Sequence, residues 1–144
     1  MTGFLLDTNV ISELVKPKPN PRVSRWVRGT DEGLLYLSAL TLGEIRKGIA
    51  SLPDASRRGK LASWLDRVLP LRFAGRILPI DQAVADRWGT ISGSAAARKS
   101  PLPVIDGLLA ATALEHNLTF VTRDTQHLAN LGAAFLDPWT EDSA

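Results

Sequence analysis

Near its amino end the chain reads Phe4-Leu5-Leu6-Asp7-Thr8-Asn9-Val10-Ile11, a short apolar run that ends abruptly in a carboxylate. Polar residues and then an amphipathic stretch follow this run. In proteins whose strands and helices alternate, such a run forms a central parallel strand, and ligands bind beyond the carboxyl ends of these strands. Asp7 is therefore expected at the edge of the sheet where a functional site forms.

Three further acidic residues occupy places where a solvated charge is not expected: Glu44, Asp106 and Asp124. Asp106 falls in the first turn of the most apolar helix predicted for the chain, where the helix dipole favours a negative charge by about 0.3–1 kcal/mol. Glu44 lies between Gly43 and an apolar helix face, and Asp124 follows a strand of buried type. Asp124 is expected beside Asp7, because the carboxyl ends of parallel strands meet at one edge.

Each acid also has an ordinary structural role open to it. Asp7 could cap a helix, Glu44 could pair with Lys47 on the surface, and Asp124 could be a turn residue. Taken together, the four acids indicate a cation site more strongly than any one of them does. Like charges about 4 Å apart repel by ~4 kcal/mol at a dielectric of roughly 20. Four carboxylates converge only with protons or a cation among them. An all-oxygen set favours Mg²⁺ or Mn²⁺, and such an ion can acidify a water and polarise a phosphodiester.

Composition gives the class of chain. The length of 144 residues, with 44% hydrophobic and 22% charged residues, predicts one domain over 1–140 and a polar tail over 141–144. No apolar run approaches the ~20 residues of a membrane helix, and no basic leader precedes the first strand. Because Cys is absent, disulfides are excluded and a cytoplasmic location is expected.

Net charge gives a weaker indication of partners. With the four acids set aside, 17 basic and 11 acidic residues leave a charge of +6. Arg outnumbers Lys, and Arg is the better bidentate partner of phosphate. A basic surface around an acidic pocket suits a nuclease, but the same charge can simply serve solubility.

Periodicity predicts alternating strands and helices. Strands are expected over 4–6, 34–37, 76–80 and 118–121, with a further strand over 133–136. Helices are expected over 10–15, 21–29, 40–52, 55–69, 82–97 and 104–116, with a weak one over 126–130. Thr8 and Asn9 are expected to cap the first helix, and Val68 is expected to face inward. The pattern predicts a three-layer α/β/α fold with a central parallel sheet of four to five strands.

Several stretches that occur in order along nearly the whole chain carry a family resemblance: Leu5-Leu6-Asp7-Thr8-Asn9-Val10-Ile11-Ser12-Glu13-Leu14, Tyr36-Leu37-Ser38 with Thr41-Leu42-Gly43-Glu44-Ile45, Phe73-Ala74-Gly75-Arg76-Ile77-Leu78-Pro79, Asp106 with Ala110-Ala111-Thr112-Ala113, and Val121-Thr122-Arg123-Asp124-Thr125. In these stretches the sequence resembles PIN-domain ribonucleases of the VapC type, particularly their FitB-like branch. The closing Asp137-Pro138-Trp139 resembles the family's Asn-Pro-Trp, with Asp in place of Asn.

The resemblance implies a metal-dependent endoribonuclease, the toxin of a type II toxin–antitoxin pair. In that family Asp7, Glu44, Asp106 and Asp124 would be the acidic quartet that holds Mg²⁺ or Mn²⁺. Asp7 and Asp106 are expected to ligate the ion most directly, and all four to be catalytic. The implied partners are RNA, a small cognate antitoxin and a second copy of the chain in a homodimer, with no membrane.

Polar neighbours could orient the carboxylates or water, namely Thr8, Asn9, Ser38 and Thr122. Ordinary capping and strand-end hydrogen bonding is the other interpretation, and it is favoured for Asn9. Arg46 and Arg123 flank the acids in sequence and are candidate RNA contacts, although a solvated face explains them equally well. Trp26 and Trp64 could serve a partner surface, but core packing is the simpler interpretation.

Two other classes of protein also have clustered acids on an α/β fold. A phosphoacceptor receiver domain needs its acceptor Asp after a mid-chain strand and a Lys after the last strand. Here Asp81 follows the mid-chain strand and resembles a helix cap, and no such Lys is evident. A non-catalytic module of the PIN fold that binds nucleic acid or protein is the stronger alternative, and an activity assay separates it from a nuclease.

Overall fold

A parallel sheet forms the centre of the molecule. The computed structural model describes residues 2–94, 98–126, 128 and 131–140. All strand pairs run parallel, in the order β3-β2-β1-β4-β5. The strands are β1 (Phe4–Leu6), β2 (Leu35–Ser38), β3 (Ile77–Leu78), β4 (Thr119–Val121) and β5 (Phe135–Leu136). The amino-terminal strand β1 is therefore central, and its carboxyl end lies between those of β2 and β4.

Both faces of this sheet are buried. Successive side chains of a strand point to opposite faces. Leu6 and Val121 accordingly belong to one buried cluster, and Leu5 and Phe120 to the other. Burial on both faces explains why the strands read as short continuous apolar runs rather than as an alternation of polar and apolar residues.

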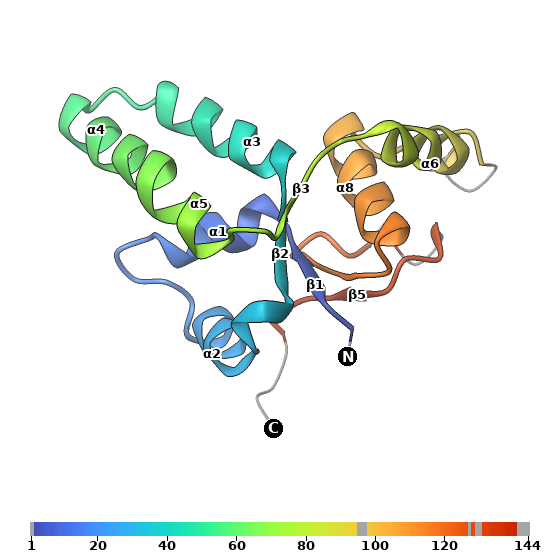
Figure 1. The fold of residues 1–144 in the computed structure, drawn as a ribbon, viewed down its shortest axis with the longest axis horizontal. Helices are drawn as coiled ribbons and strands as arrows, with labels where there is room; N and C mark the ends of the chain where they lie inside the picture. Colours follow the sequence, from blue (N-terminus) through green and yellow to red (C-terminus); the bar gives the residue numbers. More distant parts are fainter. Residues whose placement is uncertain (1, 95–97, 127, 129–130, 141–144) are drawn as a thin grey trace.

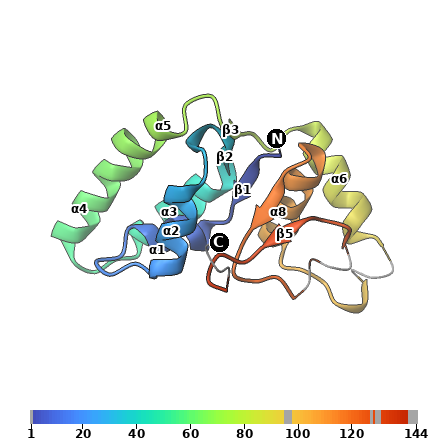
Figure 2. The same cartoon turned by 90° about the horizontal axis from the view of Figure 1, so that it is seen from below.

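Helices form the two outer layers (Figure 1, Figure 2). One side carries α1 (Thr8–Leu14), α2 (Pro21–Gly29), α3 (Ala39–Ala50), α4 (Ala55–Ser63), η2 (Trp64–Val68) and α5 (Leu69–Arg72). The other side carries α6 (Gln82–Ser92) and α8 (Val104–Glu115). The short helix η1 (Glu32–Leu34) leads into β2. The predicted three-layer α/β/α fold with a parallel sheet is confirmed.

The first helix differs from the prediction at its start. It begins at Thr8, because the carboxylate of Asp7 caps it in place of Thr8 or Asn9: Asp7 Oδ1 accepts the N–H of Thr8 at 2.7 Å. Asp7 thus occupies the strand end and the helix cap at once.

The helix predicted over 55–69 differs in its register. Trp64–Val68 forms a π-helical turn, which is wider than an α-turn and shifts the side chains that follow it. Leu65 and Leu69 are buried, whereas Val68 is 53% exposed. The prediction that Val68 faces inward is therefore wrong.

The remaining differences concern element ends. The helix predicted over 82–97 ends at Ser92, and 95–97 lie outside the described residues. In the weak helix predicted over 126–130, residues 127, 129 and 130 lie outside them too, and 126 and 128 are in turns. The tail over 141–144 is likewise not described, so the domain division stays a prediction. Within the described ranges no helix has the length and apolar character needed to cross a membrane.

Candidate functional site

The site begins where β1 and β4 end. Leu6 is paired with Val121, and the N–H of Asp7 donates to the carbonyl of Val121 at 2.9 Å. The residues that follow the two strands therefore lie side by side, and the hydroxyl of Thr122 donates to Asp7 Oδ2 at 2.7 Å. The predicted meeting of these two strand ends is observed, with Thr122 as the direct contact of Asp7.

Asp7 is a buried carboxyl group with 7% exposure. Burial raises its pKa to about 6, the hydrogen bonds from Thr122 and Thr8 act in the opposite direction, and the negative charges of Asp106 and Glu44 raise the pKa further. The charged groups that act on Asp7 are therefore acidic. A cation among these carboxylates would stabilise the ionised form of Asp7.

Glu44 reaches this centre from α3. Its Oε1 accepts the hydroxyl of Thr8 at 2.6 Å, while the N–H of Thr8 is bonded to Asp7. Thr8 thus links the carboxylates of Asp7 and Glu44. Thr8 was one of the polar residues predicted to orient the carboxylates. Among the described ion pairs, Glu44 is not joined to Lys47, so the surface pair considered from the sequence does not form.

Ser38 and Thr41 hold α3 in place. The side chain of Ser38, which is fully buried, caps the helix by accepting the N–H of Leu40 at 3.1 Å. Thr41 is also buried, and its hydroxyl lies 3.2 Å from that of Thr8. Thr41 belongs to a stretch that carries the family resemblance but is not among the predicted site residues. Its position three residues before Glu44, and so on the same helix face, is the signal that could have found it.

Asp106 lies in the first turn of α8, as predicted. It is half-buried, and its charge acts on Asp7. The next residue, Gly107, lies directly against α6: a Cβ atom at Gly107 would lie 3.1 Å from both Cδ1 and Nε1 of the Trp88 ring. The Trp88 ring therefore limits where the turn that carries Asp106 can lie.

Asp124 joins the site through Thr122. Its N–H donates to Thr122 Oγ1 at 3.1 Å, and Asn9 Nδ2 donates to the same oxygen at 3.5 Å. The side chain of Asp124 is exposed, and its charge is not among those that act on Asp7. The charges of Asp106 and Glu44 thus reach Asp7, whereas Asp124 lies at the rim.

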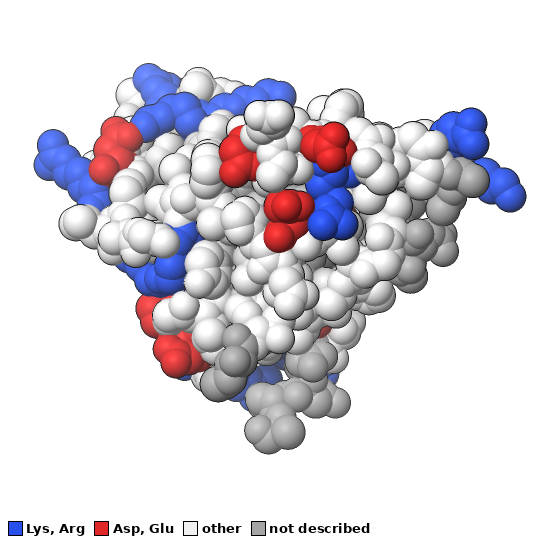
Figure 3. Space-filling view, turned by 45° about the vertical axis from the view of Figure 1, so that its right-hand side comes forward, with Lys and Arg blue, Asp and Glu red and all other residues white. Residues whose placement is uncertain are grey.

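The two candidate RNA contacts have partners within the chain. The guanidinium of Arg46 pairs with Asp66. That of Arg123 lies over the ring of Trp139, 5.1 Å from its centroid. Figure 3 shows one face of the molecule, where acidic and basic side chains adjoin in small groups between uncharged areas. Among the residues coloured there, no continuous basic surface surrounds an acidic centre.

The oxygen donors here are of the kind that a hard divalent cation prefers. Asn9 Oδ1 is buried and has no hydrogen-bond partner in the described part of the chain, so Asn9 also offers a neutral oxygen. No three acidic or His side chains within the described ranges lie close enough to hold one ion together. Mg²⁺ keeps several waters and needs only one or two direct carboxylates, so an ion held by two acids and its own waters is compatible with this arrangement.

Without divalent metal, Asp7 is expected to make the folded protein less stable at neutral pH than at acidic pH. Its pKa is raised from 3.8 to about 6 on folding, so between these values the folded state holds the proton that the unfolded state releases. The contribution of Asp7 to the free energy of unfolding is therefore full below pH 4 and falls by about 3 kcal/mol as the pH rises through 6.

Urea unfolding in chelator between pH 4 and 8, compared for the wild type and Asp7→Asn, isolates this contribution. The stability of the wild type relative to the variant should fall over that range. A constant difference would contradict the raised pKa.

The chain is similar in sequence and in fold to known proteins. Residues 4–133 match the PIN domain family. The chain is 43% identical over 137 residues to Toxin FitB of Neisseria gonorrhoeae, covering 94% of this chain and 98% of that protein. It is 38% identical over 137 residues to VapC ribonuclease Y4jK of Sinorhizobium fredii, covering 94% and 97%. The crystal structure of FitAcB from Neisseria gonorrhoeae superposes with a TM-score of 0.90 at 40% identity, covering 96% of this chain and 99% of that one.

Fold and site together define an α/β/α domain with an acidic centre at the carboxyl edge of its parallel sheet. The chain belongs to the PIN domain family.

Proposed function

We propose that this protein is a divalent-metal-dependent endoribonuclease and the toxin of a type II toxin–antitoxin pair. The observation that carries the proposal is the buried Asp7 carboxyl at the end of the central strand, with the charges of Asp106 and Glu44 acting on it. Relatives named a toxin and a VapC ribonuclease support the same activity for this chain.

Asp7 and Asp106 are the residues that would hold Mg²⁺ or Mn²⁺ directly, and Glu44 and Asp124 would hold its waters. When bound, the ion supplies a neutralising charge for phosphate oxygens and acidifies a water. Thr122 and Thr8 keep Asp7 oriented by hydrogen bonds to its two oxygens. An Asp7 carboxylate that is already oriented would hold the ion without rearranging, and the ion would then face the phosphate.

The proposal is tested by incubating purified, antitoxin-free protein with total RNA in chelator, Mg²⁺ or Mn²⁺. Discrete RNA fragments that form only with metal are expected. If folded protein leaves RNA intact under both metals but still binds RNA in a filter-binding assay, the non-catalytic binding module is the better description.

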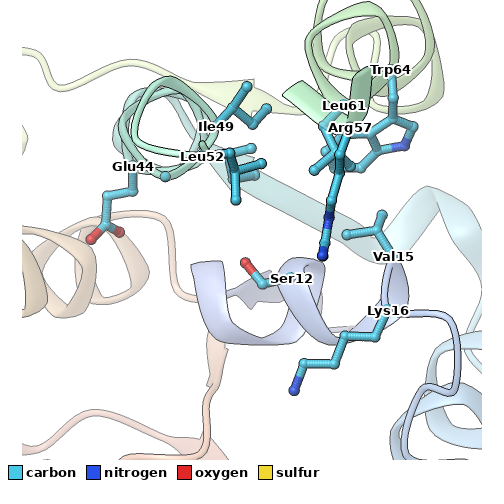
Figure 4. A pocket seen from close by; sticks show the side chains of 11 residues that line it. Ser12, Val15, Lys16, Glu44, Ile49, Leu52, Arg57, Leu61 and Trp64 are labelled. Atoms are coloured by element: carbon cyan, nitrogen blue, oxygen red, sulfur yellow. The ribbon is translucent and has the colours of Figure 1, made fainter. Parts of the chain in front are cut away.

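We propose that the antitoxin binds in a groove next to the acidic centre. The groove, about 280 Å³ in volume, lies between α1, α3 and α4 and has Glu44 at one end and Trp64 at the other (Figure 4). Ile49, Leu52 and Leu61 form its apolar wall. An inhibitor seated there would lie directly beside Glu44. Solved structures of relatives are FitAB and VapBC complexes, which supports such a partner for this chain.

Gly48→Leu is expected to weaken antitoxin binding by about 10-fold or more while leaving RNA cleavage unchanged, because a large side chain would fill part of the groove. Gly48 lines the groove, and a Cβ atom there meets nothing within 4 Å. Titration calorimetry with the cognate antitoxin measures the effect.

Gly59→Leu is the matched control, since Gly59 on α4 is equally open and does not line the groove. Equal affinities of the two variants would move the antitoxin to another surface.

The homodimer and the cytoplasmic location are part of the same proposal and rest on the family resemblance. Light scattering of the antitoxin-free protein should give twice the mass of one chain. A monomer mass at micromolar concentration would remove the homodimer from the proposal without affecting the nuclease activity.

A further inference from the structure

Three features remain outside the proposed nuclease site. Glu13 is a buried carboxylate of α1, with 6% exposure. Arg123 stands between Thr122 and Asp124 in the sequence. Trp139 belongs to the closing segment 137–139. Arg123 lies over the ring of Trp139, and its positive charge acts on Glu13.

Glu13 is held from several directions. It accepts Lys16 Nζ at 2.9 Å and the N–H of Asn20 at 3.0 Å. The hydrogen bond from Lys16 is the largest cause that lowers the pKa of Glu13, and the positive charge of Arg123 acts in the same direction. Glu13 is therefore a negative charge held in place by Lys16 and Asn20 on the side of α1, and Arg123 acts on it only through its charge.

Trp139 holds Arg123 from another element. The guanidinium carbon lies 5.1 Å from the centroid of the Trp139 ring, within the range of a cation–π interaction. The Trp139 side chain packs against the core, and the backbone N–H of Trp139 donates to Asp137 Oδ1 at 2.8 Å. Core packing places the ring, and the ring carries the Arg123 guanidinium on its face.

The backbone just before the closing segment 137–139 is also bonded to the loop that contains residues 122–124. The N–H of Thr122 donates to the carbonyl of Leu136 at 3.0 Å, as β5 pairs with β4. Thr122 then donates to Asp7 and accepts the N–H of Asp124. A shift of Arg123 would therefore be felt by the groups on both sides of it.

We propose that Arg123 is a positioning residue, held by the Trp139 ring, which fixes the loop 122–124 and so places Asp124 at the acidic centre. The closing segment 137–139 is thereby a working part of the site. The proposal rests on the proposed function for its catalytic consequence, but the positioning of the loop can be measured without any activity.

Hydrogen exchange of the peptide that spans 119–125 measures the loop itself. Arg123→Ala and Trp139→Ala should each speed exchange of the 122–124 amides by about 10-fold. Trp139→Phe keeps a ring for the guanidinium and should restore slow exchange. The control is Trp26→Ala, which removes another partly buried ring. The Trp26 ring packs edge-on against Phe4, with 5.1 Å between the two ring centroids. It should leave this peptide unchanged.

Two measurements test whether the loop affects the acidic centre. Electron paramagnetic resonance measures the affinity for Mn²⁺, and steady-state kinetics measure RNA cleavage. Arg123→Ala and Trp139→Ala should each weaken Mn²⁺ binding several-fold and lower kcat about 10-fold. The double variant should lose no more than the worse single variant, because both act through one contact. The salt dependence of KM should stay that of the wild type.

An RNA-contacting Arg123 gives a different result. KM would rise, kcat would hold, and the slope of affinity against salt would fall by about one phosphate contact, with Trp139→Ala behaving as the wild type. That result overturns the proposal, and so does unchanged exchange in Trp139→Ala. If the wild type itself binds no Mn²⁺ and cuts no RNA, the proposed function fails, while the exchange measurement still decides the role of Arg123.

Discussion

Asp7→Asn is expected to lower the rate of RNA cleavage by about 10³-fold or more while leaving the protein folded. The carboxylate is the buried member of the acidic centre, and an amide carries no charge to hold a divalent ion or to offset its charge. Removing one group that acts electrostatically on a transition state costs about 10²–10³ in rate, and loss of a direct metal ligand adds to that cost.

The fold should tolerate this substitution because an Asn side chain has the same shape and can accept the N–H of Thr8 through its oxygen. The hydrogen bond with Thr122 reverses: the amide donates to Thr122 Oγ1 in place of the long 3.5 Å contact from Asn9, and the Thr122 hydroxyl takes another acceptor. The variant also removes a buried negative charge that Asp106 and Glu44 oppose. In chelator at pH 8 the variant should therefore be at least as stable as the wild type.

The measurement is single-turnover cleavage of a defined RNA fragment, with circular dichroism as the check on folding. Asp106→Asn should show a loss of similar size. Asp54→Asn is the matched control, since Asp54 also caps a helix, α4, through its side chain, and it should cleave as the wild type does. Cleavage by Asp7→Asn within 10-fold of the wild type would sink the role given to Asp7.

Gly107→Val is expected to cost about 1–3 kcal/mol of stability and to slow cleavage by about 10- to 100-fold. The Cβ atom alone would lie 3.1 Å from the Trp88 ring, and the two methyl groups of Val extend further. Overpacking of this kind has that cost in stability. Because Asp106 is the preceding residue of the same helical turn, pushing α8 away from α6 also moves its carboxylate, and displacements of about 1 Å can cost 10²-fold in rate.

Gly43→Val is the matched control, because Gly43 precedes another site acid, Glu44, on another helix. A Cβ atom at Gly43 meets nothing within 4 Å, so this variant should stay within about 0.5 kcal/mol of the wild type. Thermal unfolding and the cleavage rate, measured together on both variants, separate packing from position. Equal melting temperatures for the two variants would mean that Trp88 gives way and that the contact does not position Asp106.

The sequence predicted the parts of this site that depend on short-range patterns. The apolar run before Asp7 indicated a buried strand, and parallel strands must end at a common edge, so Asp7 and the residues after Val121 had to meet. The most apolar helix placed Asp106 in its first turn. These predictions succeed because strand alternation, helix periodicity and chain direction are local properties of the sequence.

The sequence did not predict how the side chains share their hydrogen bonds. Thr8 joins Asp7 to Glu44, and Thr122 joins Asp7 to Asp124. Each of these links depends on two or three elements that are far apart in the chain. The choice between a surface pair of Glu44 with Lys47 and a place in the acidic site was open for this reason, since both satisfy the same local pattern.

By itself, therefore, the sequence determined the alternating α/β fold and the edge of the sheet at which Asp7 lies, whereas the assignment of the four acids to one site stays a prediction. Only the tertiary structure decided that Val68 points to solvent, because Val68 belongs to the π-turn Trp64–Val68, whose side chains do not follow the α-helical register. Only the tertiary structure decided that Trp88 sets the place of Asp106 and that Arg123 lies against Trp139. Such contacts join residues whose separation in sequence carries no information about distance, since packing, not periodicity, brings them together.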